Sequence, residues 1–117
     1  MALLGPVRLG YDEIETLLPR VSPGVFVLGN LDFQNRFSLN TIGRDDVDLK
    51  AGLRSMIGSA GYFMYSVQPT GKAAFDEECR LFHELRPSRI SHPVRSENKD
   101  WTCPHCRVTR DVARIDR

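Results

Sequence analysis

Residues 23–30, PGVFVLGN, contain the pattern that decides the fold. A proline and a glycine precede an unbroken apolar run, and Gly-Asn follows as a turn signal, which is typical of a buried β-strand. After a short polar connection, residues 37–43 (FSLNTIG) alternate apolar and polar side chains. This period of two favours a second strand, and the short connection predicts that the two strands pair as an antiparallel hairpin.

The segments on either side of this hairpin predict the remaining elements. Residues 44–58 (RDDVDLKAGLRSMIG) begin with acidic residues and end at a glycine, as a short helix does. Residues 61–68 (GYFMYSVQ) predict a third, central strand, because they are aromatic and apolar. Residues 11–21 and 73–86 have helical spacing of their apolar residues. We therefore expect an α+β fold, a small three-stranded antiparallel sheet flanked by helices.

The same pass along the chain predicts one domain with two extensions, since 117 residues form a single core. Residues 1–21 are expected to be an N-terminal helical extension and residues 22–86 the domain itself. Prolines, serines and charges dominate after residue 86. Residues 87–117 are therefore expected to be an irregular, basic segment that packs on the last helix.

One carboxylate stands out in the helix predicted over residues 73–86. Its apolar stripe, at i, i+4, i+7 and i+11, consists of Ala74, Glu78, Leu81 and Leu85. A carboxylate in a core-facing stripe is costly unless it binds a metal ion or is paired. Two interpretations remain open: Glu78 binds Mg²⁺ or Mn²⁺, or it forms an ion pair with Arg44 or Arg54.

The three cysteines suggest a metal site. Cys79 and His83 lie one helical turn apart, and Cys103 and Cys106 form a Cys-Pro-x-Cys pair, so the set reads C-x3-H followed by C-x2-C. Four such ligands suit tetrahedral Zn²⁺ in a structural site, which would clamp the C-terminal segment onto the helix. His92 is the alternative to His83. Three unrelated thiols remain possible, whereas a thioredoxin-like redox pair lacks the strand that should precede it.

Charge is distributed unevenly along the chain. Residues 1–85 hold 8 Lys/Arg and 11 Asp/Glu, net −3, whereas residues 86–117 hold 8 Lys/Arg and 4 Asp/Glu, net +4. The basic C-terminal segment is either a solvated tail or a surface for phosphates. The candidate nucleic-acid-binding residues are Arg44, Arg54, Arg86, Arg89, Arg95, Lys99, Arg107 and Arg110.

The composition also bears on location. No apolar run approaches the length of a membrane span, and the first ten residues lack the apolar core of a signal peptide. We therefore expect a cytoplasmic protein with reduced thiols and no membrane partner.

Two motifs and Glu78 follow one another in a recognisable order. The first strand carries Gly24-Val25-Phe26, the second strand carries Thr41-Ile42-Gly43-Arg44, and Glu78 on the later helix is followed three residues on by Leu81. In this order, residues 22–86 resemble the GIY-YIG nuclease family, whose fold is three antiparallel strands flanked by helices. The Cys-Pro-x-Cys pair resembles the ending of a subgroup of small GIY-YIG-like proteins.

The resemblance implies catalytic positions, and this sequence departs from most of them. Phe26 and Thr41 stand where the family has the tyrosines that flank the scissile phosphate, and Gly52 stands where it has the catalytic arginine. Arg44 matches the basic residue after the second motif. Glu78 matches the glutamate that holds a divalent cation. The candidate catalytic positions are therefore Glu78, Arg44, Thr41 and Phe26.

With the tyrosines and the arginine replaced, the usual mechanism would lose several kcal/mol of transition-state stabilisation. We therefore expect a catalytically degenerate GIY-YIG-like domain that acts as a zinc-containing nucleic-acid-binding or interaction module, with DNA favoured over RNA. The alternative is an active metal-dependent DNA endonuclease with substituted residues. In a third reading, fold and zinc are scaffolding for a protein partner.

Overall fold

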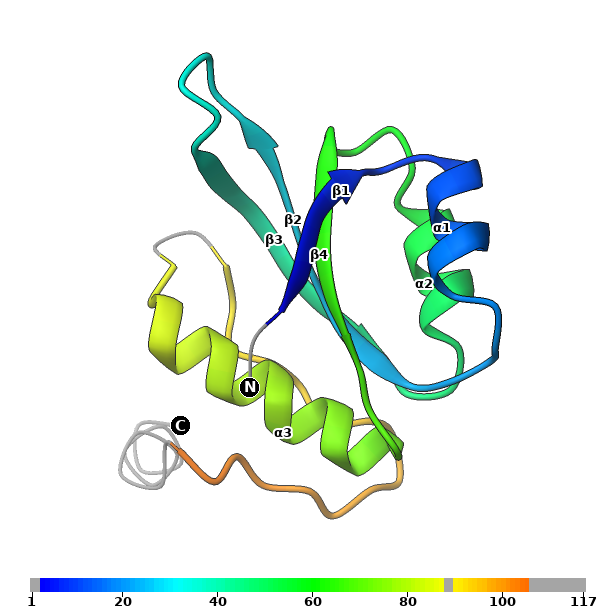
Figure 1. Ribbon diagram of the computed structural model, residues 1–117. Coiled ribbons are helices and arrows are strands. Elements are labelled where there is room, and N and C mark those ends of the chain that lie inside the picture. The colour runs from blue at the N-terminus through cyan, green and yellow to red at the C-terminus, as the bar shows by residue number, and fades with distance from the viewer. Residues whose placement is uncertain (1–2, 88–89, 106–117) are drawn as a thin grey trace.

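The computed structural model describes residues 3–87 and 90–105, which form a four-stranded antiparallel sheet and three helices (Figure 1). The elements, in chain order, are β1 (Leu4–Arg8), α1 (Tyr11–Leu17), β2 (Gly24–Leu31), β3 (Phe37–Asp45), α2 (Leu49–Ser55), β4 (Tyr62–Val67) and α3 (Gly71–Leu85). The strand order across the sheet is β1-β4-β2-β3. The expected α+β class, the β2–β3 hairpin and the interior position of β4 are confirmed.

The expected number of three strands was wrong, because residues 4–8 add an edge strand, β1, that pairs with β4. Its register shifts between Leu4 and Val7, where Gly5 and Pro6 interrupt the ladder. A short strand that contains a glycine and a proline has no apolar alternation, so the sequence pattern did not indicate it. The first 21 residues thus supply a strand as well as the helix α1, and both pack within the domain.

The register of the β2–β3 hairpin sorts residues onto the two faces of the sheet. Val25 lies opposite Arg44, and Val27 lies opposite Ile42. The intervening pairs, Phe26 with Gly43 and Leu28 with Thr41, point to the other face, because side chains alternate along a strand.

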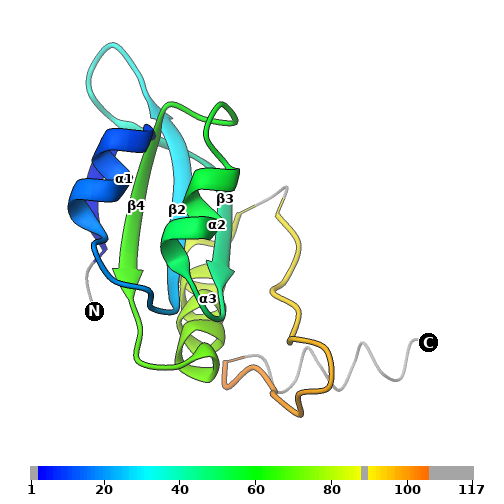
Figure 2. The same cartoon turned by 90° about the vertical axis from the view of Figure 1, so that its right-hand side faces the viewer.

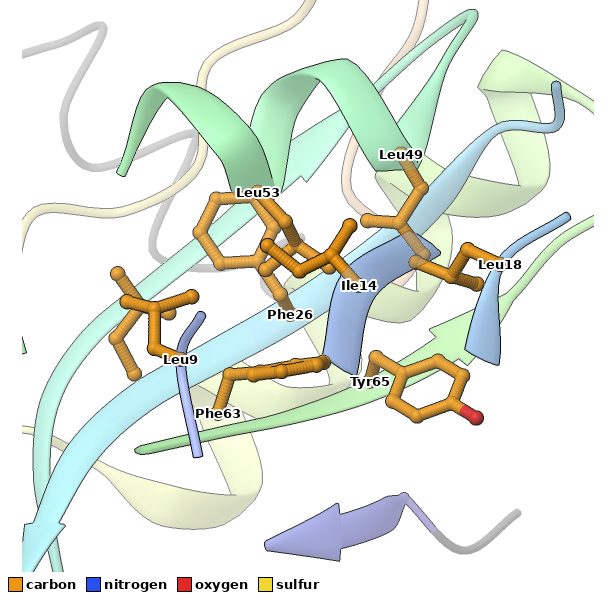
Figure 3. Packing of buried hydrophobic residues seen from close by; sticks show 9 residues of the cluster. Leu9, Ile14, Leu18, Phe26, Leu49, Leu53, Phe63 and Tyr65 are labelled. Carbon is orange, nitrogen blue, oxygen red and sulfur yellow. The ribbon is translucent and has the colours of Figure 1, made fainter. Parts of the chain in front are cut away.

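One face of the sheet is covered by α1 and α2 (Figure 2). Ile14 from α1, Leu53 from α2 and Phe63 from β4 are each fully buried there. Figure 3 shows these side chains packed with Phe26 and Tyr65 in one apolar cluster. We call this side of the sheet the α1/α2 face.

The opposite face is covered by α3, which packs on β2 and β3. Thr70 caps the start of α3, since its side chain accepts a hydrogen bond from the amide of Ala73 at 3.0 Å. Ala74 and Leu81 are buried against the sheet as the stripe predicted, but Leu85 is 45% exposed, because α3 ends there. We call this side the α3 face.

After α3 the chain runs back without regular structure beside the helix and the sheet edge at β3 (Figure 2). We call residues 90–105 the C-terminal loop. The loop contacts Phe75 of α3, Arg44 at the end of β3, and Asp46 in the connection between β3 and α2. These contacts hold the loop in place and form the site described next.

Candidate metal centre

Three donors gather between α3 and the C-terminal loop. They are the thiols of Cys79, in the middle of α3, and Cys103, with the imidazole of His92 from the start of the loop. One ligand atom of each lies within 4.8 Å of the other two. Cys79 is fully buried and Cys103 is 5% exposed, so both thiols are shielded from solvent, whereas His92 is half-buried. These three residues lie close enough to hold one metal ion.

The surrounding hydrogen bonds prepare two of these donors for a cation. Nδ1 of His92 lies 2.8 Å from the carbonyl oxygen of Pro93. Donation from Nδ1–H to this carbonyl keeps the lone pair on Nε2, the nitrogen then able to bind a metal. The amide of His105 donates a hydrogen bond to Sγ of Cys103 at 3.4 Å, and this contact helps to fix the position of the sulfur.

His83 is not among the three donors, and the alternative ligand His92 takes its place among the described residues. The ring of His83 packs edge-on against Phe82, and its centroid lies 5.2 Å from that of His92. Its Nε2 is buried without a hydrogen-bond partner among the described residues. Burial lowers the pKa of His83, and the neighbouring His92 and His105 lower it further. Cys106, the fourth expected ligand, lies outside the described residues.

The second feature of the site is the guanidinium of Arg44, at the end of β3. Its Nε donates to Asp46 at 2.7 Å and its Nη1 to Glu78 at 2.6 Å. Its Nη2 donates to the carbonyl of Val94 at 2.8 Å and to Oγ of Ser96 at 3.1 Å. We call Arg44 and these four partners the arginine hub. Of the two arginines expected as partners of Glu78, the one that forms the ion pair is Arg44, whereas Arg54 pairs with Glu15.

Two aromatic rings complete the surroundings of the guanidinium. It lies 5.0 Å from the ring centroid of Phe75 and 5.9 Å from that of Trp101. These rings pack against each other at 5.6 Å, and together with Cys79 and Cys103 they form one buried cluster. The arginine hub and the metal donors are therefore in physical contact through Trp101.

Burial has opposite effects on the two charged groups of the central ion pair. Burial raises the pKa of Glu78 above its ordinary value, although the hydrogen bond from Arg44 counteracts the rise. Burial alone would lower the pKa of Arg44, but the bonds to Asp46 and Glu78 outweigh it and raise that pKa. Arg44 stays charged at every physiological pH.

The four candidate catalytic positions do not converge. Arg44 and Glu78 meet on the α3 face, whereas Phe26 and Thr41 belong to the α1/α2 face. Phe26 is 5% exposed and part of the apolar core. A hollow of about 570 Å³ opens beside Arg44, and its lining carries the carboxylates of Asp45, Asp46 and Glu78. Such a lining repels phosphate.

The candidate nucleic-acid-binding residues have different surroundings. Arg54 pairs with Glu15 at 2.7 Å, on the side of the sheet away from the C-terminal loop. Arg86, Arg95 and Lys99 are exposed, and Arg95 lies 3.7 Å from Asp100. Arg89, Arg107 and Arg110 lie outside the described residues.

Several residues of the site were missed in the sequence, namely Asp46, Phe75, Val94, Ser96 and Trp101. The only signal was local: Asp46 lies two residues after Arg44, and Trp101 lies two residues before Cys103. The hydrogen bonds of Arg44 with Val94 and of Asp46 with Ser96 each join residues 50 positions apart, and no short-range pattern encodes such pairs.

Comparisons with known proteins add no further constraint. No protein-family model, curated protein or solved structure matches the chain. Within residues 3–87 and 90–105, the three helices are too short and too polar to cross a membrane.

Proposed function

We propose that the chain is a non-catalytic, zinc-stabilised nucleic-acid-binding module with a GIY-YIG-like fold. One observation carries the proposal: Arg44 and Glu78, the two retained motif residues, neutralise each other in a buried pair. The surplus of positive charge lies in the segment that the Cys79/His92/Cys103 donors attach to α3. In this proposal the domain does not cleave phosphodiesters and serves as a scaffold that presents the basic C-terminal segment.

Zinc is the metal that these donors suit best. Two thiolates and one imidazole are soft to borderline ligands, which favour Zn²⁺ over the harder Mg²⁺ or Mn²⁺. Around one tetrahedral ion, with metal–ligand distances of about 2.0 Å to nitrogen and about 2.3 Å to sulfur, these donors would lie roughly 3.5–3.8 Å apart. Donors within 4.8 Å of one another therefore need to close by about 1.3 Å at most. Cys106 would supply the fourth ligand.

The β4-β2-β3 order and the helix between β3 and β4 support the GIY-YIG resemblance. The hub argues against a working nuclease. All three guanidinium nitrogens of Arg44 are engaged by protein groups, and Glu78 accepts from Arg44 at 2.6 Å. A scissile phosphate beside them would also meet Asp45 and Asp46.

Charge pairing supports the C-terminal segment as the nucleic-acid contact. Within residues 1–85, seven of the eight Lys/Arg residues form ion pairs with nearby carboxylates, so the domain offers phosphates little net charge. By contrast, Arg86 and Lys99 are exposed cations on or beside the C-terminal loop. Phosphate binding depends on such unneutralised cations.

The first test is the metal content of purified wild type and of Cys103→Ser in parallel. We expect about one zinc per wild-type chain, and none retained by Cys103→Ser after gel filtration in a weak chelator. Zinc-free wild-type protein, purified under reducing conditions, would overturn the metal part of the proposal.

The second test is binding to a short labelled DNA duplex, and to its RNA counterpart, at several salt concentrations. We expect affinity to fall linearly in log–log form, with a slope of about −0.9 per phosphate contact on DNA. The variant Arg86→Ala/Lys99→Ala should bind more weakly with a shallower slope. Lys72→Ala, whose lysine already pairs with Asp76, is the matched control.

The same samples separate the competing readings. Nicking of the duplex that needs Mg²⁺ or Mn²⁺ and disappears in Glu78→Gln would establish the endonuclease instead. Absence of any salt-sensitive binding to DNA or RNA would point to a protein partner and contradict the proposed function.

A further inference from the structure

The C-terminal loop is anchored at two kinds of position. Two of the candidate metal donors lie at its ends, His92 near the start and Cys103 near the finish. Arg44 holds the stretch between them. Its Nη2 binds the carbonyl of Val94, two residues after His92, and its guanidinium faces the ring of Trp101, two residues before Cys103.

The guanidinium of Arg44 is itself held rigidly from the domain side. The carboxylates of Asp46 and Glu78 fix Nε and Nη1, and only 10% of the arginine side chain is exposed. Nη2 is therefore presented to the loop in one orientation. Ser96 reinforces this contact, because its hydroxyl accepts from Arg44 and donates to Asp46.

Trp101 connects the two anchors. Its ring packs on Phe75, in the same buried cluster as the thiols of Cys79 and Cys103. When the loop makes its contacts with the guanidinium of Arg44, through Val94 and Trp101, it thus also places Cys103 beside Cys79. Conversely, a metal ion that joins these thiols places Trp101 over the guanidinium.

We propose that Arg44 is the positioning residue of the metal centre, and that metal binding and loop docking on Arg44 stabilise each other. The proposal rests on the zinc site proposed above. Ordering the loop costs conformational entropy, and this cost opposes metal binding when the loop is free. A loop already docked on Arg44 has lost that freedom, so the ion binds more tightly. By linkage, bound metal strengthens docking by the same factor.

A purely structural role for Arg44 predicts a different result. The loss of Arg44 would then destabilise the protein equally with and without metal, and the affinity for zinc would not change. The decisive quantity is therefore the difference between variants in their response to metal, not their stability alone.

The experiment measures zinc affinity by competition with a chromophoric chelator, for full-length wild type and three variants. Arg44→Lys keeps a positive charge but removes the fork of donors. Ser96→Ala removes the two hydrogen bonds of the hydroxyl, to Arg44 and to Asp46, and leaves the core of the domain intact. Arg54→Lys is the matched control, because Arg54 forms its ion pair with Glu15 on the other side of the sheet.

We expect Arg44→Lys to weaken zinc binding by about 10–100-fold, the usual effect of losing a group that orients metal ligands. Ser96→Ala should weaken it several-fold, and Arg54→Lys should leave it unchanged. The rise in Tm on adding zinc should shrink in the same order. Emission from Trp101, the single tryptophan of the chain, should report undocking at a lower chelator concentration in Arg44→Lys than in wild type.

Each failure has a distinct signature. Wild type that binds no zinc overturns the proposed metal site itself. If wild type binds zinc and Ser96→Ala and Arg44→Lys bind it equally well, only the coupling is overturned. If Arg44→Lys does not fold, Ser96→Ala decides: unchanged zinc affinity and an unchanged zinc-dependent rise in Tm contradict the coupling.

Discussion

The two faces of the sheet are closed by different physical means. On the α1/α2 face, apolar side chains such as Ile14, Leu53 and Phe63 exclude water completely. On the α3 face, the apolar contacts of Ala74 and Leu81 continue into a buried ion pair and a cluster of metal donors. The first closure is non-directional, whereas the second depends on particular atoms meeting at particular distances.

This difference separates two roles: one face contributes mainly to the stability of the fold, and the other fixes the position of the C-terminal loop. Apolar burial contributes in proportion to area and tolerates changes of shape that conserve volume. A buried ion pair adds little net stability over apolar packing, but the loss of one partner is costly. We therefore expect the α1/α2 face to set the global stability and the α3 face to set the position of the C-terminal loop.

Among the variants that test this difference between the faces, we expect Phe63→Ala to have the largest effect on the free energy of unfolding. The side chain is fully buried in the α1/α2 face, so its removal leaves a cavity and should cost about 3–5 kcal/mol of unfolding free energy. Urea unfolding followed by circular dichroism measures the loss. Phe33→Ala, at a position that is 93% exposed, should change it by less than about 0.5 kcal/mol. Equal effects of the two variants would contradict the assigned core.

The next effect belongs to the arginine hub. Glu78→Gln leaves Arg44 buried without its closest carboxylate and should cost about 2–3 kcal/mol. The matched control is Glu84→Gln on the same helix, whose exposed carboxylate pairs with Arg80 and whose loss should cost below about 1 kcal/mol. Urea unfolding compares them. A Glu78→Gln variant as stable as wild type would show that the ion pair is not needed to close the α3 face.

The smallest effects compare the caps of the two helices that cover opposite faces. Thr70 caps α3 and Asp48 caps α2, each through a side chain that accepts from a backbone amide. Thr70→Ala and Asp48→Ala should each cost about 1 kcal/mol, since each frees one amide at a helix start. Only the α3 variant should also weaken zinc binding, as measured by chelator competition. A loss of zinc affinity in Asp48→Ala would show that the two faces are not independent.

Local sequence patterns predicted most of the fold. The apolar run that became β2, the alternation of β3 and the aromatic stretch of β4 have periods that a single strand imposes on its own sequence. The strand β1 has no such period, because Gly5 and Pro6 interrupt it and its pairing with β4 involves only Leu4, Val7 and Arg8. The helix predicted from residue 44 begins only at Leu49, since residues 44 and 45 continue β3.

For the site, the pattern identified the unusual residues but not all of their partners. Helical spacing placed Glu78 toward the sheet, and Arg44 was one of two arginines expected to pair with it. The spacing of Cys79 and His83 suggested that both bind one ion, yet the loop brings His92 to Cys79 instead. Which histidine approaches depends on how the loop returns along α3, and that path is set by Arg44 and Trp101 over long sequence separations.

The interruption in β1 has a consequence for how the sheet meets other chains. An edge strand with an unbroken row of amides and carbonyls is a template on which a foreign strand can grow. At β1 the register shift and the missing amide of Pro6 remove that regularity. On the opposite edge, β3 is also irregular, because its register with β2 shifts between Leu28 and Gly29 and leaves Asn40 outside the pairing. Neither edge of the sheet therefore offers a foreign strand an unbroken ladder, and this irregularity protects the domain from edge-to-edge aggregation.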